Sequence, residues 1–498
     1  MTSQRSILGC TLVAAAAASL LTAPAASAAP LTDPASVSVA RPDDFDGDGY
    51  RDVVVAAPDA QVGQVRAAGQ IAVHYGSASG AVTTRRQTFH QDSPGVPDQA
   101  EEGDRFGHAL ATGDLDRDGY TDLVVSTPLE DYQPQFENQG MLTVVWGGSQ
   151  GLAGAATVLE GPIREGQNGT LLTAGDYDGD GDTDLALNHS HKDLRILSGP
   201  FGRDGSAAAS NTFITGGFYQ RVSHLATGDI NGDGRDDLFS VRRLTDMPQR
   251  DTRGTVYWLG APGGPSGPGT PVLANQETTS FGGDELALGD VDKDGYDDLV
   301  IARYDEYTGT EPPPPAALGG KVTWIPGSAQ GPKGDLAQHI NQDTPGVPGA
   351  AEADDAFGSG VAVGDIDGDG YADISAGVPS EELNGTAGTD HGAVVTLRGG
   401  PTGPTGTGAQ SFNQNTAGVP GAAEAGDAFG RTTALIDTDG DGRSELFAGA
   451  PGENVNSGAV WSFDATPSGP TAQGSVSFGP AATGIHPDGA AFGSAFQD

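Results

Sequence analysis

Apolar residues in this chain occur in short runs that are separated by turns rich in glycine, proline and aspartate. Runs such as Val53–Val55 and Leu123–Val125 carry no helical periodicity. Several runs end at a small residue followed by proline, as at Ala57-Pro58, and a further apolar run then follows a glycine, as in residues 69–76. The pattern predicts an all-β chain with roughly four short strands in each unit, which is typical of a propeller blade.

A nine-residue pattern, D-x-D-x-D-G-x-x-D, occurs seven times, and successive copies begin 70, 62, 53, 61, 75 and 72 residues apart. We number these copies loop 1 to loop 7 in chain order. Seven copies at this spacing indicate a repeat architecture. The candidate metal ligands are Asp44, Asp46, Asp48 and Asp52 in loop 1; Asp114, Asp116, Asp118 and Asp122 in loop 2; Asp176, Asp178, Asp180 and Asp184 in loop 3; Asp229, Asn231, Asp233 and Asp237 in loop 4; Asp290, Asp292, Asp294 and Asp298 in loop 5; Asp365, Asp367, Asp369 and Asp373 in loop 6; and Asp437, Asp439, Asp441 and Glu445 in loop 7.

The chemistry of this pattern favours calcium, with up to seven ions bound. Calcium takes six to eight oxygen ligands in loose geometry, and carboxylates at positions 1, 3 and 5 of a tight turn converge on one point. Glycine at position 6 permits the bend, and the acid at position 9 connects the ion to the following strand. Thiolate and imidazole ligands are missing from the pattern, which argues against zinc and copper.

An EF-hand shares the first half of this pattern but requires glutamate at position 12 and flanking helices. Position 12 is Val55 in loop 1 and Val125 in loop 2, and it is never glutamate in the other loops. The EF-hand interpretation therefore fails. A plain polar turn would leave four like charges crowded in each copy, which is costly.

The first residues predict an export signal. Arg5 precedes an apolar run from Ile7 to Leu21, and Ala26-Ser27-Ala28 offers a cleavage pattern, so we expect residues 1–28 to be a signal peptide. Residues 29–42 are then a linker. The apolar run is shorter than the span of a bilayer, and no second such run follows, so no transmembrane segment is expected. The single cysteine lies inside the signal, which excludes disulfides from the mature chain.

Charge changes the list of partners. The chain has 67 acidic and 25 basic residues and a net charge of −42. This charge argues against nucleic acid as a partner. The acids fall at fixed spacing between apolar strands, which favours cation binding over disorder.

Two further signatures accompany the loops. Gly-Asp stands before most of them, and Phe-Gly lies eight or nine residues earlier, at Phe106, Phe281, Phe357 and Phe429. With the calcium loop, these signatures resemble the FG-GAP repeat family, found in the head of integrin α-subunits and in bacterial secreted proteins. The resemblance implies a seven-bladed β-propeller over residues 43–498. Loops 3 to 5 lack the proline corner, and units three and four lack Phe-Gly.

The chain ends suggest how such a ring closes. No Phe-Gly precedes loop 1, whereas Phe492-Gly493 near the C-terminus has no loop after it. We therefore expect the C-terminal strand to complete the first blade. Closure would remove an open sheet edge.

A longer phrase is also repeated. Residues 90–107, which contain Gln91 and Glu101, recur as residues 341–358 and 413–430. We interpret the phrase as a connector between blades that was duplicated with its unit, and its exposed residues are open to a binding role.

No catalytic set is evident. Gly147–Gly151 matches G-x-S-x-G, but residues 76–80 and 327–331 resemble it at the same place in other units, so it is interpreted as a recurring turn. The resemblance implies a secreted or cell-surface recognition or adhesion module for an extracellular protein or glycan, expected to be a monomer. The alternatives are an extracellular hydrolase or lyase acting at a propeller face, and a structural cell-surface component.

Overall fold

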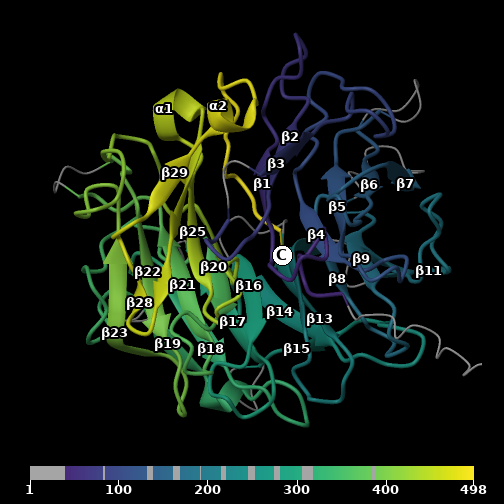
Figure 1. Ribbon diagram of the computed structural model, residues 1–498. Coiled ribbons are helices and arrows are strands. Elements are labelled where there is room, and N and C mark those ends of the chain that lie inside the picture. Colours follow the sequence, from purple (N-terminus) through teal and green to yellow (C-terminus); the bar gives the residue numbers. More distant parts are fainter. Residues whose placement is uncertain are drawn as a thin grey trace, which may run out of the picture. The chain divides into compact units, whose positions relative to one another are not determined.

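The computed structural model describes residues 40–497 except 82–84, 132–137, 161–168, 191, 215–219, 245–252, 274–280, 305–317 and 384–387. The expected signal peptide and most of the expected linker lie outside the described residues. The described chain is almost entirely β-structure (Figure 1). Its short helical turns are η1 (Gly334–Leu336), α1 (Glu453–Asn456) and α2 (Pro480–Thr483).

The strands form seven antiparallel sheets, or blades, that follow one another along the chain. Blade 1 contains β1 (Val53–Ala57), β2 (Gln70–His74) and β3 (Arg86–Phe89), and blade 2 contains β4 (Leu110–Gly113), β5 (Asp122–Thr127), β6 (Met141–Val145) and β7 (Ala155–Glu160). Blade 3 contains β8 (Leu172–Gly175), β9 (Asp184–Asn188), β10 (Asp193–Ser198) and β11 (Ala209–Ile214), and blade 4 contains β12 (Gln220–Gly228), β13 (Asp237–Leu244), β14 (Arg253–Trp258) and β15 (Thr270–Pro271). Blade 5 contains β16 (Glu285–Gly289), β17 (Asp298–Arg303), β18 (Lys321–Ile325) and β19 (Gln338–Ile340). Blade 6 contains β20 (Val361–Gly364), β21 (Asp373–Val378), β22 (Ala393–Arg398) and β23 (Thr405–Phe412). Blade 7 contains β24 (Thr432–Ile436), β25 (Glu445–Ala450), β26 (Ala459–Phe463) and β29 (Val476–Phe478), with a small hairpin of β27 (Ala465–Thr466) and β28 (Gly469–Pro470).

The hydrophobic cores lie between the blades. Each of seven apolar clusters joins residues of two successive blades, and one of them joins the last blade to the first. In that cluster Val53 and Val55 of β1 pack with Phe447 of β25 and Val460 of β26. The seven sheets therefore form a ring, and the predicted seven-bladed all-β propeller is confirmed.

Burial on both faces explains the uninterrupted apolar runs. Val53 and Val55 contribute to the cluster between blades 7 and 1, whereas Val54 and Ala56 contribute to the cluster between blades 1 and 2. Successive side chains of a strand point to opposite faces, so a strand with two covered faces needs apolar residues at every position.

The Phe-Gly signature connects one blade to the next. Phe106 is fully buried, and its backbone lies against Gly69, which precedes β2 of blade 1. Gly69 has a φ of +89°, and a Cβ there would lie 2.2 Å from the Phe106 carbonyl oxygen, so only glycine fits. Phe492 makes the same approach to Gly458 of blade 7.

The C-terminal residues lie beside β1 at its free edge. Val55 pairs with Phe496 in antiparallel fashion, and the Ala56 N–H donates to the Ala495 carbonyl oxygen at 2.9 Å. The buried Gln497 side chain accepts from the Val54 N–H and donates to the Asp52 carbonyl oxygen, each at 2.7 Å.

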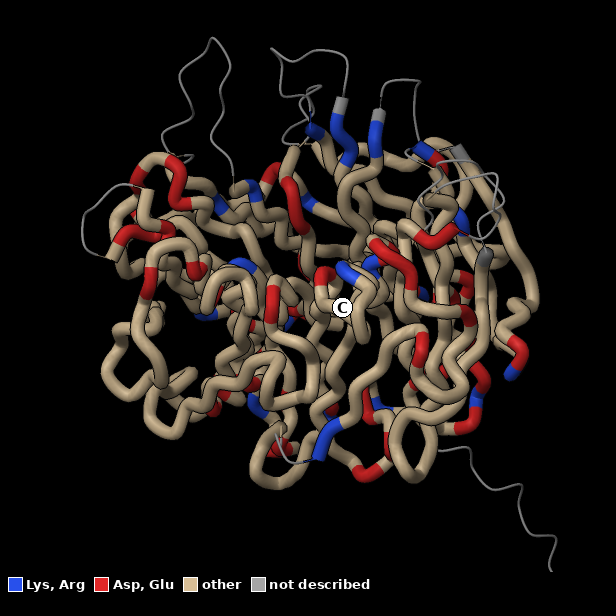
Figure 2. Tube along the Cα trace, turned by 90° about the horizontal axis from the view of Figure 1, so that it is seen from above, with Lys and Arg blue, Asp and Glu red and all other residues tan. Residues whose placement is uncertain are grey.

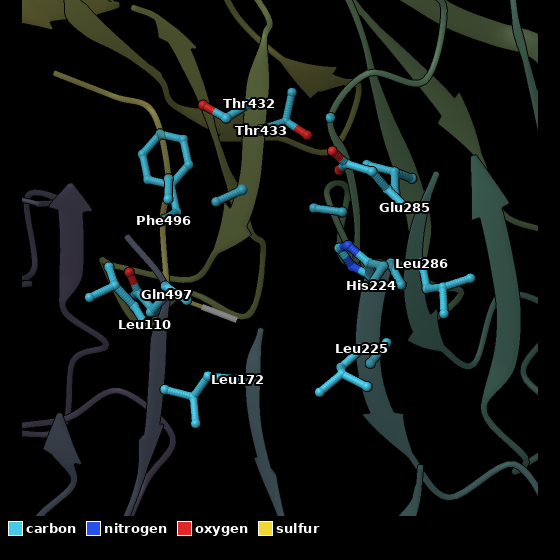
Figure 3. A pocket seen from close by; sticks show the side chains of 18 of the residues that line it. Leu110, Leu172, His224, Leu225, Glu285, Leu286, Thr432, Thr433, Phe496 and Gln497 are labelled. Atoms are coloured by element: carbon cyan, nitrogen blue, oxygen red, sulfur yellow. The ribbon is translucent and has the colours of Figure 1, made fainter. Parts of the chain in front are cut away.

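The innermost strands surround a central cavity of about 530 Å³. Strands β4, β8, β12, β16, β20 and β24 and residues 494–497 line it. Figure 3 shows His224 and Glu285 on its wall together with leucine side chains and Phe496. Desolvation of His224 by the enclosing sheets lowers its pKa to about 4.

Replacing Gln497 with alanine tests the contact between the C-terminal segment and β1. The change leaves the Val54 N–H and the Asp52 carbonyl without their partner, which should lower the free energy of unfolding by about 2 kcal/mol. Denaturant unfolding measures the loss. The exposed Gln473 offers a matched control, and equal stability of the two alanine variants would contradict the assignment.

The lowered pKa of His224 predicts an acid-sensitive stability. As the pH falls below about 6.5, His224 binds a proton in the unfolded chain, whereas in the folded chain it stays neutral until about pH 4. The free energy of unfolding therefore decreases across that interval. His224→Gln should flatten this part of the stability curve, measured in chelator to keep metal ions out of the comparison. The exposed His486→Gln variant is the control, and an unchanged slope in His224→Gln would refute the prediction.

Candidate metal centres

Loops 2 to 7 occupy the same place in their blades, between the innermost strand and the next one, and loop 1 leads into β1 of blade 1. Loop 2, for example, leads from β4 to β5. The position-1 carboxylate fixes the turn: Asp114 accepts the Asp118 N–H at 3.1 Å and the Gly119 N–H at 3.0 Å. The position-6 glycine donates to the position-1 acid in every loop, at 2.8–3.1 Å.

Carboxylates of the same loop also lie close to one another, as the D-x-D-x-D pattern predicts. One oxygen from each of three acids lies within 4.8 Å of the others in loops 1, 2, 3 and 5. These triads are Asp44, Asp46 and Asp48; Asp114, Asp116 and Asp122; Asp176, Asp178 and Asp184; and Asp290, Asp292 and Asp294. Asp292 Oδ1 is buried and has no hydrogen-bond partner among the described residues. An orphaned oxygen within a carboxylate triad suits a hard metal ion, so the loops could hold such ions.

The position-9 acid also makes hydrogen bonds to the backbone. In all seven loops one of its oxygens accepts the backbone N–H of position 2, at 2.8–3.2 Å. In loops 1 to 6 the other oxygen accepts the N–H of a glycine at 2.7–2.9 Å. This glycine follows the third strand of the blade in blades 2 to 6, and in blade 1 it is Gly76, which follows β2. The acid therefore joins the metal loop to the opposite hairpin with or without a metal ion.

The glycine that donates to the position-9 acid is required because another segment of backbone lies close to it. A Cβ at Gly147 would lie 2.2 Å from the Thr121 carbonyl oxygen. Loop 7 departs from the rule, because Ala465 stands where the other blades have glycine. Its position-9 acid is Glu445, which accepts the Thr438 N–H at 2.8 Å and the Thr438 hydroxyl at 2.7 Å through one oxygen. The longer acid and the missing glycine thus occur in the same blade.

Burial of the position-9 acids opposes their charged form. Desolvation raises the pKa of Asp52 to about 8 and that of Asp122 to about 7. It likewise raises the pKa of Asp373 to about 6 and that of Glu445 to about 7. The hydrogen bonds from backbone N–H groups act in the opposite direction without cancelling it. A bound cation would restore the charged form.

Arginine side chains from outside the loops lie against the acids of three loops. Arg85 pairs with Asp46 and Asp48 of loop 1, and Arg203 pairs with Asp116 and Asp118 of loop 2. Arg398 lies 2.8 Å from Asp367 and 3.2 Å from Asp373 in loop 6. None of these arginines belongs to a loop, so the D-x-D-x-D-G pattern gave no sign of them. A guanidinium supplies part of the positive charge that each carboxylate group requires.

Loop 4 shows how its one amide fits the pattern. The Asn231 Oδ1 atom accepts the Asp233 N–H at 2.9 Å, and its Nδ2 atom donates to the Asp233 carboxylate at 3.2 Å. The amide thus keeps an oxygen at position 3 and lowers the charge of the loop.

The repeats are also recognisable by comparison with known families. Residues 106–145, 357–396 and 429–463 match the FG-GAP repeat. Residues 44–125 and 229–301 match the FG-GAP-like repeat, so the matched segments contain six of the seven loops. The chain belongs to the FG-GAP repeat family.

Several relatives of this FG-GAP propeller are integrin α chains. Human integrin alpha-IIb is 31% identical over 185 residues, which make up 33% of this chain and 16% of the integrin. Integrin alpha pat-2 of Caenorhabditis briggsae is 28% identical over 232 residues, 42% of this chain and 18% of the relative. Phosphatidylinositol-glycan-specific phospholipase D of Rattus norvegicus is 29% identical over 147 residues, 29% of this chain and 17% of the relative. The matches therefore span less than a fifth of each relative.

Two other predictions can be compared with the propeller. Ser149 lies in a turn between β6 and β7 that is closed by the Gly151 N–H donating to the Gly148 carbonyl at 2.7 Å. Gly80 and Gly331 close the same turn in blades 1 and 5, which confirms its interpretation as a recurring turn. Within the described part of the chain, no helix has the length and apolarity needed to cross a membrane.

Sequence reasoning missed the polar residues that lie at the other end of the blades. Gln91, Asp104 and Glu130 are all buried, and the carboxylates of Asp104 and Glu130 lie within 4.8 Å of each other and of Glu101. In the sequence, Gln91 and Asp104 belong to the repeated connector phrase, which we interpreted as a connector duplicated with its unit. Its glutamine and acids had no partner visible in the sequence.

Two variants of loop 5 can separate the hydrogen bonds of the loop acids from their expected role in metal binding. Asp298→Asn weakens the contacts with Val291, Gly327 and the Trp324 indole N–H, so it should lower stability by about 3 kcal/mol even in chelator. Asp292→Asn removes an acid that has no hydrogen-bond partner at Oδ1. It should leave stability in chelator unchanged and reduce only the stabilisation by added metal. Thermal unfolding measures both, and identical behaviour of the two variants would show that the two roles are not divided.

Proposed function

We propose that this FG-GAP protein is a secreted, calcium-stabilised propeller that recognises an extracellular protein or glycan. The observation that carries the proposal is the repeated loop, in which three acids lie within 4.8 Å of one another in loops 1, 2, 3 and 5. The signal-like first 28 residues support export. Calcium is plentiful outside cells, and the mature chain has no cysteine with which to form disulfides.

Calcium suits the donor set better than other metals. The proposed ligands are the acids of the seven loops and Asn231, which are all hard oxygen donors. Within each loop, a bound ion would neutralise acids whose pKa burial has raised, as at Asp46, Asp114 and Asp292. The ions would hold the seven turns in position. We also propose that the C-terminal segment beside β1 completes blade 1 and closes the ring.

A recognition role rests on the relatives and on the surface. The integrin α chains align with a third or more of this propeller, and extracellular recognition is the function that this likeness suggests for it. Figure 2 shows acidic residues distributed over the described ring, with Lys and Arg interspersed among them. Such a surface disfavours nucleic acid and suits a protein or glycan partner that engages mixed charges or bound calcium.

Calcium should raise the melting temperature of the mature protein strongly. An ion bound only by the folded state stabilises it by about 2.7 kcal/mol for each site at a concentration 100 times its Kd. Thermal unfolding is measured in excess calcium, in excess magnesium and in chelator. Magnesium is the matched control, because its stricter octahedral geometry fits the loops less well.

The same samples test recognition. Biotinylated protein is applied to an array of glycans and to extracellular matrix proteins, and specific binding that is lost in chelator supports the proposed function. An unchanged melting temperature in calcium would refute calcium stabilisation. Stabilisation by calcium without specific binding to any extracellular component would refute the recognition role and favour a structural one.

A further inference from the structure

The connectors between blades contain a second set of buried carboxylates, far along the strands from the metal loops. Loop 2 lies where β4 ends and β5 begins, whereas Asp104 precedes β4 and Glu130 follows β5. Because β4 and β5 are antiparallel, Asp104 and Glu130 lie at the opposite end of this strand pair. Gln91, which follows β3 of blade 1, reaches the same place.

The three side chains form one cluster. The Gln91 Nε2 atom donates to the Glu130 carboxylate at 2.5 Å, and Asp104 accepts the Glu101 N–H at 2.6 Å. One oxygen each from Glu101, Asp104 and Glu130 lies within 4.8 Å of the others. Asp104 and Glu130 are only 3% and 2% exposed. Two carboxylates are therefore buried together, and one of them accepts a hydrogen bond from an amide N–H.

The glutamine supplies an observation that is independent of the acids. Gln91 is 1% exposed, and its Oε1 atom has no hydrogen-bond partner among the described residues. Its amide group touches the Glu130 carboxylate, so the unpartnered oxygen lies at the edge of the carboxylate cluster. A buried carbonyl oxygen without a donor is unfavourable unless a cation or a water molecule occupies the adjacent space.

The cluster is repeated twice more, and the orphaned oxygen is repeated with it. Between blades 5 and 6, Gln342 donates to Glu381 at 2.7 Å and Asp355 accepts the Glu352 N–H at 2.7 Å. Between blades 6 and 7, Gln414 donates to Glu453 at 2.6 Å and Asp427 accepts the Glu424 N–H at 2.7 Å. Unpartnered atoms are Gln342 Oε1, Asp355 Oδ1 and Gln414 Oε1. We call the three groups the connector clusters.

Blade 1 provides an internal comparison. The residue two positions before its Phe492 is Ala490, where the connector clusters have aspartate, and the residue two positions after its Pro58 is Ala60, where they have glutamate. Pro480, two positions after the end of β29, takes the place of the glutamine. Ala60 and Ala490 are fully buried in one apolar cluster, and Pro480 is also buried.

At these four junctions the three polar positions are thus present together or absent together. The glutamine and the aspartate belong to one connector, but the glutamate follows the second strand of the next blade, as Glu130 follows β5. Duplication of the connector alone therefore does not explain why the glutamate is lost with them in blade 1. Joint presence is expected if the three side chains serve one ligand. The alanine version also shows that the blade junction closes well without them, which argues against a purely architectural need.

We propose that each connector cluster binds a calcium ion through its aspartate, its glutamate and the glutamine Oε1 atom. Carboxylate and amide oxygens are the donors that calcium prefers. The glutamate of the connector strand, Glu101 in the first cluster, adds a further carboxylate at the exposed side. Burial and the charge of Asp104 raise the pKa of Glu130, which is the direction expected for acids buried together without a cation. These three sites are separate from the seven loops proposed above.

The residues of blade 1 supply the test. Asp104→Ala with Glu130→Ala converts the first cluster to the apolar pair found at Ala490 and Ala60. Calcium bound per chain is measured by equilibrium dialysis and elemental analysis, and the expected result is the loss of one ion. The same change at Asp355 with Glu381, or at Asp427 with Glu453, should also remove one ion, and all three changes together should remove three.

Asp292→Ala in loop 5 is the matched control, because alanine removes the position-3 oxygen that an asparagine such as Asn231 would keep. This variant should lose one ion through a loop and leave the connector clusters filled. Unchanged stoichiometry in the connector variants, with a loss in Asp292→Ala, would overturn the connector proposal alone. Unchanged stoichiometry in Asp292→Ala with a loss in the connector variants would overturn the proposed loop sites instead.

Crystals of the wild-type mature protein soaked in terbium give a second measurement that does not depend on the variants folding. An anomalous peak between Gln91, Asp104 and Glu130, and at the two equivalent places, supports the proposal. Ordered water or a direct carboxyl–carboxylate contact at those places, without anomalous signal, overturns it.

Discussion

The position-9 acid is the interaction on which the rest of each blade depends. It accepts one backbone N–H from its own loop and, in six blades, another from a turn on the far side of the same strand pair, so it fixes two loops to each other. The first N–H belongs to the position-2 residue, whose side chain lies in a core between blades in loops 1 to 6. Because a carboxylate with two donors still has free lone pairs, the same group can also contribute to a metal ion. Backbone geometry and ion binding are therefore coupled at one side chain.

This coupling explains why apolar and polar contacts stabilise different parts of the propeller. Apolar burial lies between the blades, where alternate residues of a strand such as β1 enter two different cores. Such cores hold the sheets side by side and take in the position-2 side chain of loops 1 to 6, but the acids of each turn lie outside them. The described residues include no cysteine. Carboxylates placed at the turns are suited to fix them through contacts with backbone N–H groups, arginines and cations.

The repeat and the number of blades could be predicted from the sequence. The residues that contact the loop acids could not be predicted from it, for physical reasons. Seven aspartate loops that begin 53 to 75 residues apart and runs such as Val53–Val55 led to seven blades, because both depend on local spacing. The Gly147 N–H that Asp122 accepts lies 25 residues later. The arginines that reach loops 1, 2 and 6 come from positions outside the pattern. The first connector cluster combines Gln91 and Asp104 of one connector with Glu130 of the next blade, and only the folded blades bring them together.

The connector clusters also show why a repeat can be informative without any other sequence for comparison. Each blade junction is an independent solution to the same packing problem, and blade 1 solves it with Ala60, Ala490 and Pro480. At three other junctions the polar residues leave a buried amide oxygen without a partner among the described residues, which is unfavourable unless a ligand fills the adjacent space. Without a ligand, the apolar set would be favoured at these junctions. Retention of the polar set at three junctions is therefore best explained by a ligand that the apolar junction could not bind.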